Sequence, residues 1–289
     1  MPELLSICIP TFNRSAYLND LLEHLVPELE ATPGAADLVR FYISDNASTD
    51  DTRELVSRFS LRWPIVYNCN PVNIGADRNF AQMIDKAPGT YFWLLGDDEL
   101  LVRGFLAHLL EVLKPATHDL VLLGTVSQEG TPSTFVQMEK PATFPNYAAF
   151  LDYYRKTNPW EIMAHSFISS MMIKRSIFDL KKTREILGTV DRCYAHMYGL
   201  VDGLARDPGS IYLDNQASVI IRTRRATIYD VSTLEINYLW RRYYRWLGLK
   251  FGHPDLVEYG RTLFGPRKWW RMKRQHLKAA LGLNPKKKA

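Results

Sequence analysis

The stretch Tyr91-Phe92-Trp93-Leu94-Leu95-Gly96-Asp97-Asp98-Glu99 decides the fold of this chain. Its first residues are uncharged and mostly apolar, which predicts a buried strand of a parallel sheet. Three carboxylates follow Gly96 directly, and in an open α/β sheet ligands bind beyond the carboxyl ends of the strands. Adjacent acids repel one another unless a cation lies among them, and Mg²⁺ or Mn²⁺ prefers such oxygen ligands. The alternative is that the acids open the next helix, where carboxylates suit the positive dipole end.

The composition is that of an ordinary globular protein, with 46% apolar and 23% charged residues among 289. Cys8, Cys69 and Cys193 are too few and too scattered for a disulfide framework or a zinc site. We therefore expect a protein of the reducing cytosol without a signal peptide. We also expect no membrane-spanning segment, because no run of about 18 apolar residues exists.

Short apolar runs alternate with stretches of helical periodicity along the first half of the chain. This alternation predicts a β-α repeat and therefore a parallel sheet with helices on both faces. Pro27 is expected to kink or end the first helix, and 124–145 is expected to be a loop. The predicted strands are 4–10, 38–44, 65–69, 90–95 and 120–123, and the predicted helices lie around 18–29, 55–59, 76–86 and 105–113.

Turns rich in Asp, Asn and Thr follow successive strands. We expect these turns to gather along one edge of the sheet, where a nucleotide can bind. The sequence has no G-x-G-x-x-G and no G-x-x-x-x-G-K-[ST] stretch, which argues against a dehydrogenase or a P-loop NTPase. A nucleotide-sugar pyrophosphorylase would need a glycine-rich basic loop, which is also missing.

Four polar turns, in this order and spacing, resemble the motifs of glycosyltransferase family 2. The resemblance covers about residues 4–125. Within the family, the chain is most similar to bacterial enzymes that add abequose, rhamnose or related sugars to O-antigen. The four motifs are Ser6-Ile7-Cys8-Ile9-Pro10-Thr11-Phe12-Asn13-Arg14, Ser44-Asp45-Asn46-Ala47-Ser48-Thr49-Asp50, Asn73-Ile74-Gly75 with Arg78-Asn79, and Leu95-Gly96-Asp97-Asp98-Glu99.

The resemblance implies a GT-A fold, in which a nucleotide-sugar-binding sheet is flanked by helices. It also implies inverting transfer from a nucleoside-diphosphate sugar. Residues at matching positions would bind this donor: the first motif against the nucleoside, Asp45 on the base, and the third motif along the base and diphosphate. The implied donor-binding residues are Pro10, Thr11, Asn13, Arg14, Asp45, Asn73, Gly75, Arg78 and Asp97.

Three of these donor-site interpretations have a simpler structural alternative. Asp45 would then only cap a turn, as Asp often does. Arg78 would be a solvated charge on a helix. Asn73-Ile74-Gly75 would be a tight turn without a ligand.

The family also implies a divalent metal, Mn²⁺ or Mg²⁺, on the donor diphosphate. Such an ion would neutralise the charge that grows as the sugar bond breaks. The usual acidic motif is Asp, any residue, Asp, but Gly96 stands at its first position here. The resemblance therefore gives Asp98 as the main metal ligand, with Glu99 or Asp97 as helper. The departure predicts a weaker dependence on metal than is usual.

The second half of the chain is expected to bind the acceptor and to supply the catalytic base. In the family, an acidic residue at a helix start after a second-half strand takes the proton of the acceptor hydroxyl. Asp191 matches that position, and the alternative is a plain carboxylate at a helix N-terminus. His165 and His196 are further candidates, for which hydrogen-bonded structural histidines are the favoured alternative. Other predicted elements are helices over 147–154 and 177–186 and strands over 167–174, 211–213 and 218–222.

The C-terminal region interleaves aromatic and basic residues. Residues 241–289 hold 14 Lys or Arg and 2 Asp or Glu, a net charge of +12, so the rest of the chain carries −7 of the total of +5. Aromatic and basic residues together suit the headgroup layer of a membrane, which predicts contact with an anionic membrane surface. The alternatives are a helical appendage packed on the domain, or a nucleic-acid-binding protein. The acidic body counts against the latter, so no nucleic acid is expected.

Together these features predict an α/β glycosyltransferase domain over 1–225 and a basic, aromatic helical extension over 226–289. The domain would divide into a nucleotide-sugar half, 1–125, and an acceptor half, 126–225. The expected partners are a nucleoside-diphosphate sugar and a saccharide acceptor, lipid-linked in cell-surface polysaccharide synthesis. The expected location is the cytoplasm, peripheral at the inner face of the cell membrane.

Overall fold

The computed structural model describes residues 2–134, 138–159, 162, 166–188, 194–206, 209–222 and 233–262. The chain forms two compact units, Met1–Arg224 and Arg225–Ala289. The described part of the first unit contains a single sheet with helices packed on it, and that of the second contains a pair of helices. None of the described helices combines the length and the apolarity needed to cross a membrane.

The sheet of the first unit is mixed, with strand order β3-β2-β1-β4-β9-β6-β10-β5, β7 beside β6 and β8 beside β10. β1 to β4 are parallel to one another, as the β-α alternation predicts. The second half differs, because β9, β5, β7 and β8 pair antiparallel with their neighbours. The strands are β1 (Leu5–Thr11), β2 (Val39–Asp45), β3 (Ile65–Cys69), β4 (Tyr91–Leu94), β5 (Leu100–Leu101), β6 (Leu120–Ser127), β7 (Pro132–Thr134), β8 (Ala142–Phe144), β9 (Met171–Lys174) and β10 (Ile211–Ile221).

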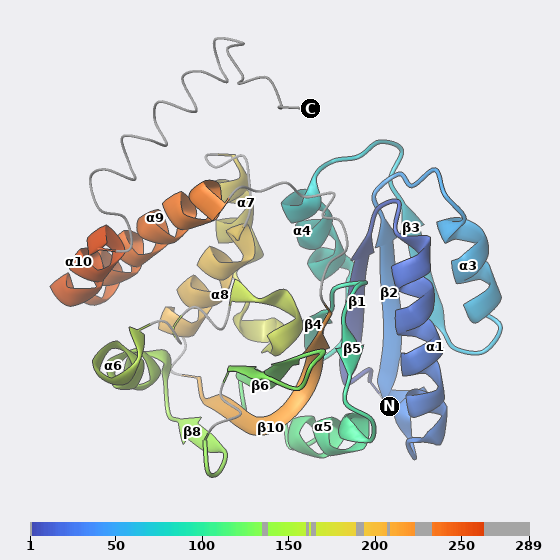
Figure 1. Cartoon of the computed structure of the whole chain (residues 1–289), viewed down its shortest axis with the longest axis horizontal. Helices are drawn as coiled ribbons and strands as arrows, with labels where there is room; N and C mark the ends of the chain where they lie inside the picture. Colours follow the sequence, from blue (N-terminus) through green and yellow to red (C-terminus); the bar gives the residue numbers. More distant parts are fainter. Residues whose placement is uncertain are drawn as a thin grey trace, which may run out of the picture. The chain divides into compact units, whose positions relative to one another are not determined.

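Helices cover both faces of the parallel strands. Figure 1 shows α1 and α3 on one side of β1, β2 and β3, and α4 on the other side. Strand residues such as Leu5, Phe41 and Trp93 are fully buried between these layers. The helices are α1 (Ser15–Ala31), α2 (Ala35–Leu38), α3 (Thr52–Phe59), α4 (Ala76–Lys86), α5 (Phe105–Leu113), α6 (Tyr147–Thr157), α7 (Leu180–Leu187), α8 (Ala195–Arg206), α9 (Thr233–Phe251) and α10 (Pro254–Thr262).

Four local expectations differ from the structure. Pro27 does not end α1, which continues to Ala31. Proline has no N–H to donate to the Glu23 carbonyl one turn earlier, but Pro27 and Glu23 lie on the exposed side of the helix, where water can donate to that carbonyl instead. The expected loop over 124–145 contains the end of β6 and two short strands. The two strands predicted over 211–213 and 218–222 form one strand, β10, because register shifts between Leu213 and Val219 absorb the polar residues between them.

The strand predicted over 167–174 is also shorter than expected. A 3₁₀ turn, Ile168–Ser170, precedes β9, and its Ser169 is fully buried. The Ser169 hydroxyl accepts a hydrogen bond from the Gly96 N–H at 3.0 Å, and the Ser169 carbonyl accepts one from the Trp93 indole at 2.9 Å. This turn therefore fastens the second half of the chain to the end of β4.

Candidate active site

The loops after β1, β2 and β4 meet at the carboxyl edge of the parallel sheet. Thr11 ends β1 and lies opposite Asp45, which ends β2. The Thr11 hydroxyl donates a hydrogen bond of 2.8 Å to Oδ2 of Asp97, in the acidic turn after β4. Two of the predicted donor-binding motifs thus contact one another directly, although 86 residues separate Thr11 from Asp97.

Arg14 bridges the two aspartates of the acidic turn. Its Nε lies 3.2 Å from Asp97 Oδ1, and its second guanidinium nitrogen lies 2.6 Å from Asp98 Oδ2. Only 11% of the Arg14 side chain is exposed. Burial lowers the pKa of Arg14, but the charges of Asp97 and Asp98 outweigh it, so the net shift of this pKa is upward. Arg14 is therefore a permanent cation inside the acidic edge.

A second arginine, which the sequence reasoning missed, reaches the same turn from the end of β10. Arg222 Nε donates to the backbone carbonyl of Asp98 at 2.6 Å, and a terminal nitrogen pairs with Asp20 of α1 at 2.8 Å. The ring of Tyr17 lies within cation-π distance of both arginines, 4.7 Å from Arg14 and 5.1 Å from Arg222. No spacing in the sequence indicates this contact, because Asp98 and Arg222 are 124 positions apart.

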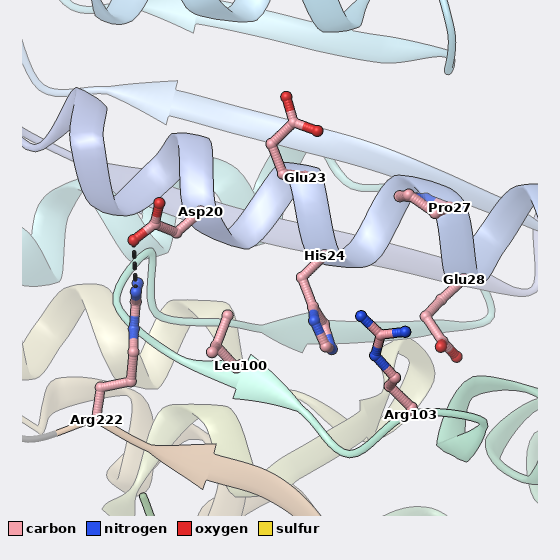
Figure 2. A pocket seen from close by; sticks show the side chains of 8 residues that line it. All are labelled: Asp20, Glu23, His24, Pro27, Glu28, Leu100, Arg103 and Arg222. Atoms are coloured by element: carbon pink, nitrogen blue, oxygen red, sulfur yellow. Dashed lines mark hydrogen bonds and ion pairs between the residues drawn. The ribbon is translucent and has the colours of Figure 1, made fainter.

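The Arg222–Asp20 ion pair borders a hollow of about 420 Å³ between α1 and β5. Figure 2 shows His24 and Glu28 pointing toward Arg103 in this hollow, whereas Glu23 points away. The His24 ring hydrogen-bonds to the Leu101 carbonyl at 2.7 Å. The predicted donor-binding residues do not line this hollow. We therefore place the candidate site at the acidic turn and the loops that contact it.

The loop after β1 is tied to the loop after β2 by side chains that bond to the backbone. Asn13 adopts a left-handed conformation with φ of 51°, and its Oδ1 accepts from the Thr49 N–H at 2.7 Å. In return, the Asn13 N–H donates to Ser48 Oγ at 2.8 Å. Ser15 N–H donates to Asp50 at 2.8 Å. These bonds fix the backbone on both sides of Arg14.

Asp45 is fully buried at the end of β2 and has two partners within the protein. Its Oδ1 accepts from the Ser48 N–H at 2.7 Å, and its Oδ2 accepts from the Tyr67 hydroxyl at 2.6 Å. Burial raises the pKa of Tyr67, and the Asp45 carboxylate raises it further, so this hydroxyl remains a donor. Asp45 therefore caps the turn after β2, and its contact with the base stays a prediction, since a carboxylate oxygen can accept more than one hydrogen bond.

The Asn73-Ile74-Gly75 turn is held by buried amide side chains that the sequence reasoning did not identify. Asn46 donates to Asn73 Oδ1 at 2.8 Å and accepts from the Ile74 N–H at 2.9 Å. Gly75 has φ of 83°, a conformation that favours glycine. The network continues behind the turn through Asn70, Asn79, Ser44 and Gln82.

Arg78 lies on the exposed first turn of α4. It lines a hollow of about 590 Å³ together with Arg184 and Leu187 of α7. Arg184 pairs with Asp85 of α4 at 2.9 Å. The structure thus places Arg78 beside α7, on an exposed surface, and its donor role stays a prediction.

The predicted catalytic base, Asp191, lies outside the described residues, as does His165. His196, in the first turn of α8, is 3% exposed and lies against the rings of Phe80 and Tyr194. Burial lowers the pKa of His196 to about 4. His196 is therefore a neutral and weakly basic side chain at neutral pH.

The acidic turn has carboxylates that suit a divalent ion, but several of their oxygen atoms already have partners within the protein. Asp97, Asp98 and Glu99 are each at most 5% exposed, and carboxylate oxygens suit Mg²⁺ or Mn²⁺. Arg14, however, takes one oxygen of each aspartate, and Thr11 takes the other oxygen of Asp97. Within the described ranges, no three His, Cys, Asp or Glu side chains are grouped to hold one ion. As arranged, the turn does not fit a divalent ion alongside Arg14.

The parallel half-sheet, its antiparallel continuation and the acidic edge define a GT-A type glycosyltransferase fold. Residues 1–349 of TarS of S. aureus, solved with UDP-GlcNAc, align with a TM-score of 0.63 over 88% of this chain and 70% of that fragment, at 13% identity. The mannosyltransferase PcManGT from Pyrobaculum calidifontis, solved with GDP-Man and Mn²⁺, aligns with a TM-score of 0.54 over 98% of this chain and 81% of PcManGT, also at 13% identity. At these identities the likeness concerns the fold alone.

The sequence model described as Glycosyl transferase family 2 matches residues 6–180, more than half of the chain. The chain therefore belongs to glycosyltransferase family 2, which confirms the family predicted from its motifs.

Among individual proteins, abequosyltransferase RfbV of Salmonella typhimurium is 41% identical over 106 residues, 36% of this chain and 31% of RfbV. An uncharacterized protein of Mycobacterium tuberculosis is 29% identical over 97 residues, 32% of this chain and 27% of that protein. The aligned stretches span less than a third of these curated relatives.

Proposed function

We propose that the chain transfers a sugar from a nucleoside-diphosphate donor to a hydroxyl of a saccharide acceptor, with inversion at the anomeric carbon. The observation that carries this proposal is the buried acidic turn at the carboxyl edge, contacted by Thr11 and Arg14. Proteins of the same fold were solved with UDP-GlcNAc and GDP-Man, which supports a nucleotide sugar as the donor class. In this proposal residues 1–125 bind the donor and residues 126–225 bind the acceptor.

The donor would lie along the loops that the structure brings together. Pro10, Thr11 and Asn13 would contact the nucleoside, and Asp45 would accept from the base. The diphosphate would lie nearer the acidic turn and the Arg14 guanidinium. The negative charge that develops on the leaving group would then be stabilised by a fixed positive charge in a buried site. The remaining proposed donor-side residues are Arg14, Asn73, Gly75, Arg78 and Asp97.

The reaction needs one proton acceptor. The acceptor hydroxyl would attack the anomeric carbon while the bond to the diphosphate oxygen breaks, and the diphosphate would leave with the bonding electrons. The hydroxyl proton would go to Asp191, which we propose from its position in the sequence. A divalent ion with Asp98 and Glu99 as ligands stays a prediction, which donor binding with and without Mn²⁺ tests.

The likeness to RfbV supports a deoxyhexose donor and an acceptor in O-antigen synthesis. A lipid-linked acceptor would require contact with a membrane. The second unit has a suitable surface, because Arg242, Arg245, Leu249 and Lys250 are all exposed on α9. We therefore propose peripheral binding to the anionic cytoplasmic face of a membrane, and salt-dependent co-sedimentation of the full chain with anionic but not neutral vesicles tests it.

A donor screen by calorimetry tests the proposed function. The full chain is titrated with UDP-, GDP-, CDP- and dTDP-linked sugars, each with and without Mn²⁺. We expect one nucleotide class to bind clearly tighter than the others, and the transfer assay with a saccharide acceptor then uses that donor. Failure of every donor and every free nucleoside diphosphate to bind would overturn the proposal.

A further inference from the structure

Arg14 occupies the position that a cation would take between the carboxylates of the acidic turn. Its guanidinium reaches Asp97 at 3.2 Å and Asp98 at 2.6 Å, and all three side chains are nearly buried. A planar guanidinium that contacts two carboxylates at once is a strong and directional counterion. A divalent ion bound by both aspartates would compete with this guanidinium for Asp97 Oδ1 and Asp98 Oδ2.

The position of Arg14 is built into the fold rather than adopted by a freely moving side chain. The residue before it, Asn13, has φ of 51° and is bonded to the loop after β2 through Thr49 and Ser48. The residue after it, Ser15, is bonded to Asp50. Tyr17 lies beneath the guanidinium at 4.7 Å. The chain therefore delivers a fixed positive charge to the acidic turn.

Position 96 supplies no carboxylate and has little room for one. A Cβ atom on Gly96 would lie 3.1 Å from Asp98 Oδ1 and 3.3 Å from Glu99 Cγ. A side chain there would require Asp98, one of the two carboxylates that Arg14 contacts, and Glu99 to shift by a few tenths of an ångström. The acidic turn thus lacks the first acid of the usual motif, at position 96, and contains the Arg14 guanidinium as an internal cation.

We propose that Arg14 is the resident cation of the acidic turn. A divalent ion can be coordinated by both Asp97 and Asp98 only if it displaces the Arg14 guanidinium. The inference deepens the proposed function, on which it rests for the identification of the turn as the donor side. It predicts that the wild-type protein binds a divalent ion weakly when no donor is present. It also predicts that removing the guanidinium exposes a tighter site.

The test is a titration of wild type and of Arg14→Gln with Mn²⁺ alone. Electron paramagnetic resonance measures the concentration of free Mn²⁺ at each step. We expect the variant to bind Mn²⁺ at least tenfold tighter than wild type. Mn²⁺ should also raise the melting temperature of the variant, whose aspartates have lost their counterion, and leave that of wild type nearly unchanged. Arg14→Lys keeps the charge but not the bridging geometry and should bind with intermediate affinity, so it carries the test if Arg14→Gln does not fold.

Two further variants locate the effect. Arg62→Gln removes a guanidinium from an exposed pair with Glu30 and should leave Mn²⁺ affinity as in wild type. Arg14→Gln combined with Asp98→Asn should lose the gained affinity. Equal affinities in wild type and both Arg14 variants, whether tight or undetectable, would overturn the inference. Because no donor is present, the titration reads this inference independently of whether the chain transfers a sugar.

Discussion

The acidic turn and the Asn73-Ile74-Gly75 turn lie at the same edge of the sheet but are held by different interactions. Two mostly buried arginines, Arg14 and Arg222, hold the acidic turn through charged contacts. Neutral amides hold the other turn, with Asn46 as the direct contact. The edge predicted to bind the donor is thus held in two ways. We call the contacts of Arg14 and Arg222 with the acidic turn the charged clamp, and the contacts of Asn46 with the Asn73-Ile74-Gly75 turn the amide clamp.

The difference has an energetic consequence. Removing one partner of a buried ion pair leaves an uncompensated charge, which costs about 3–5 kcal/mol. Removing one partner of a neutral buried hydrogen bond costs about 1–3 kcal/mol. The charged clamp should therefore be the more sensitive of the two to single substitutions, and the only one of the two that responds to divalent ions.

Asp98→Ala should have the largest effect on the charged clamp. It removes a predicted metal ligand and a partner of Arg14, so we expect transfer to fall by about 10²–10³ or more and stability to fall by about 3 kcal/mol. Transfer rates and urea denaturation measure the two losses separately. Asp98→Asn keeps the shape without the charge and should lose most of the activity with a smaller loss of stability. Full activity in both variants would show that the acidic turn lies outside the active site.

Arg222→Ala tests the other half of the charged clamp. The guanidinium bonds to the Asp98 carbonyl, and hydrogen bonds to charged groups contribute about 1.5–3 kcal/mol, so we expect a stability loss of that size. Donor binding should also weaken, because the turn loses its tie to α1. Arg222→Lys should recover part of both losses. Arg62→Ala, in a solvent-exposed ion pair, is the matched control and should leave the denaturation midpoint unchanged. Equal behaviour of Arg222→Ala and this control would show that the contact positions nothing.

The sequence predicts the parts of the site that follow strands directly. Thr11, Asp45 and the acidic turn are found at the carboxyl edge because parallel strands bring their carboxyl ends together, which the β-α alternation already implies. The contacts of Arg222 with Asp98 and of Asn46 with Asn73 could not be predicted in this way. They depend on the antiparallel second half and on side-chain directions, neither of which has a periodic signal in the sequence.

Arg14 shows that contacts within a recognised motif can also be impossible to predict from the sequence. Its position near the nucleoside follows from the resemblance, but its bridge between Asp97 and Asp98 depends on the left-handed Asn13 and on the loop that holds it. A mobile surface arginine and a buried counterion look identical in sequence. The structure separates them by burial and geometry.

Asn46→Ala tests the amide clamp. It leaves the Ile74 N–H and the Asn73 side chain without their partner, so we expect a stability loss of about 1–3 kcal/mol by urea denaturation. Donor affinity should fall as the turn loses its fixed shape, while Mn²⁺ binding without donor should stay as in wild type. Asn68→Ala removes a more peripheral amide of the same region and should cost less. A change in Mn²⁺ affinity in Asn46→Ala would show that the two clamps are coupled.

Arg78→Ala should have the smallest effect, although it removes a full charge from a predicted donor-binding residue. Arg78 is exposed on α4, and a solvated guanidinium contributes about 1 kcal/mol or less to a contact with an anion. We therefore expect donor affinity to fall less than about tenfold, with a smaller fall at high salt, because screening already weakens the wild-type contact. Arg184→Ala in the same hollow is the control and should have a similar or smaller effect. A hundredfold loss confined to Arg78→Ala would mean that this side chain leaves the solvent on donor binding and contacts the diphosphate directly.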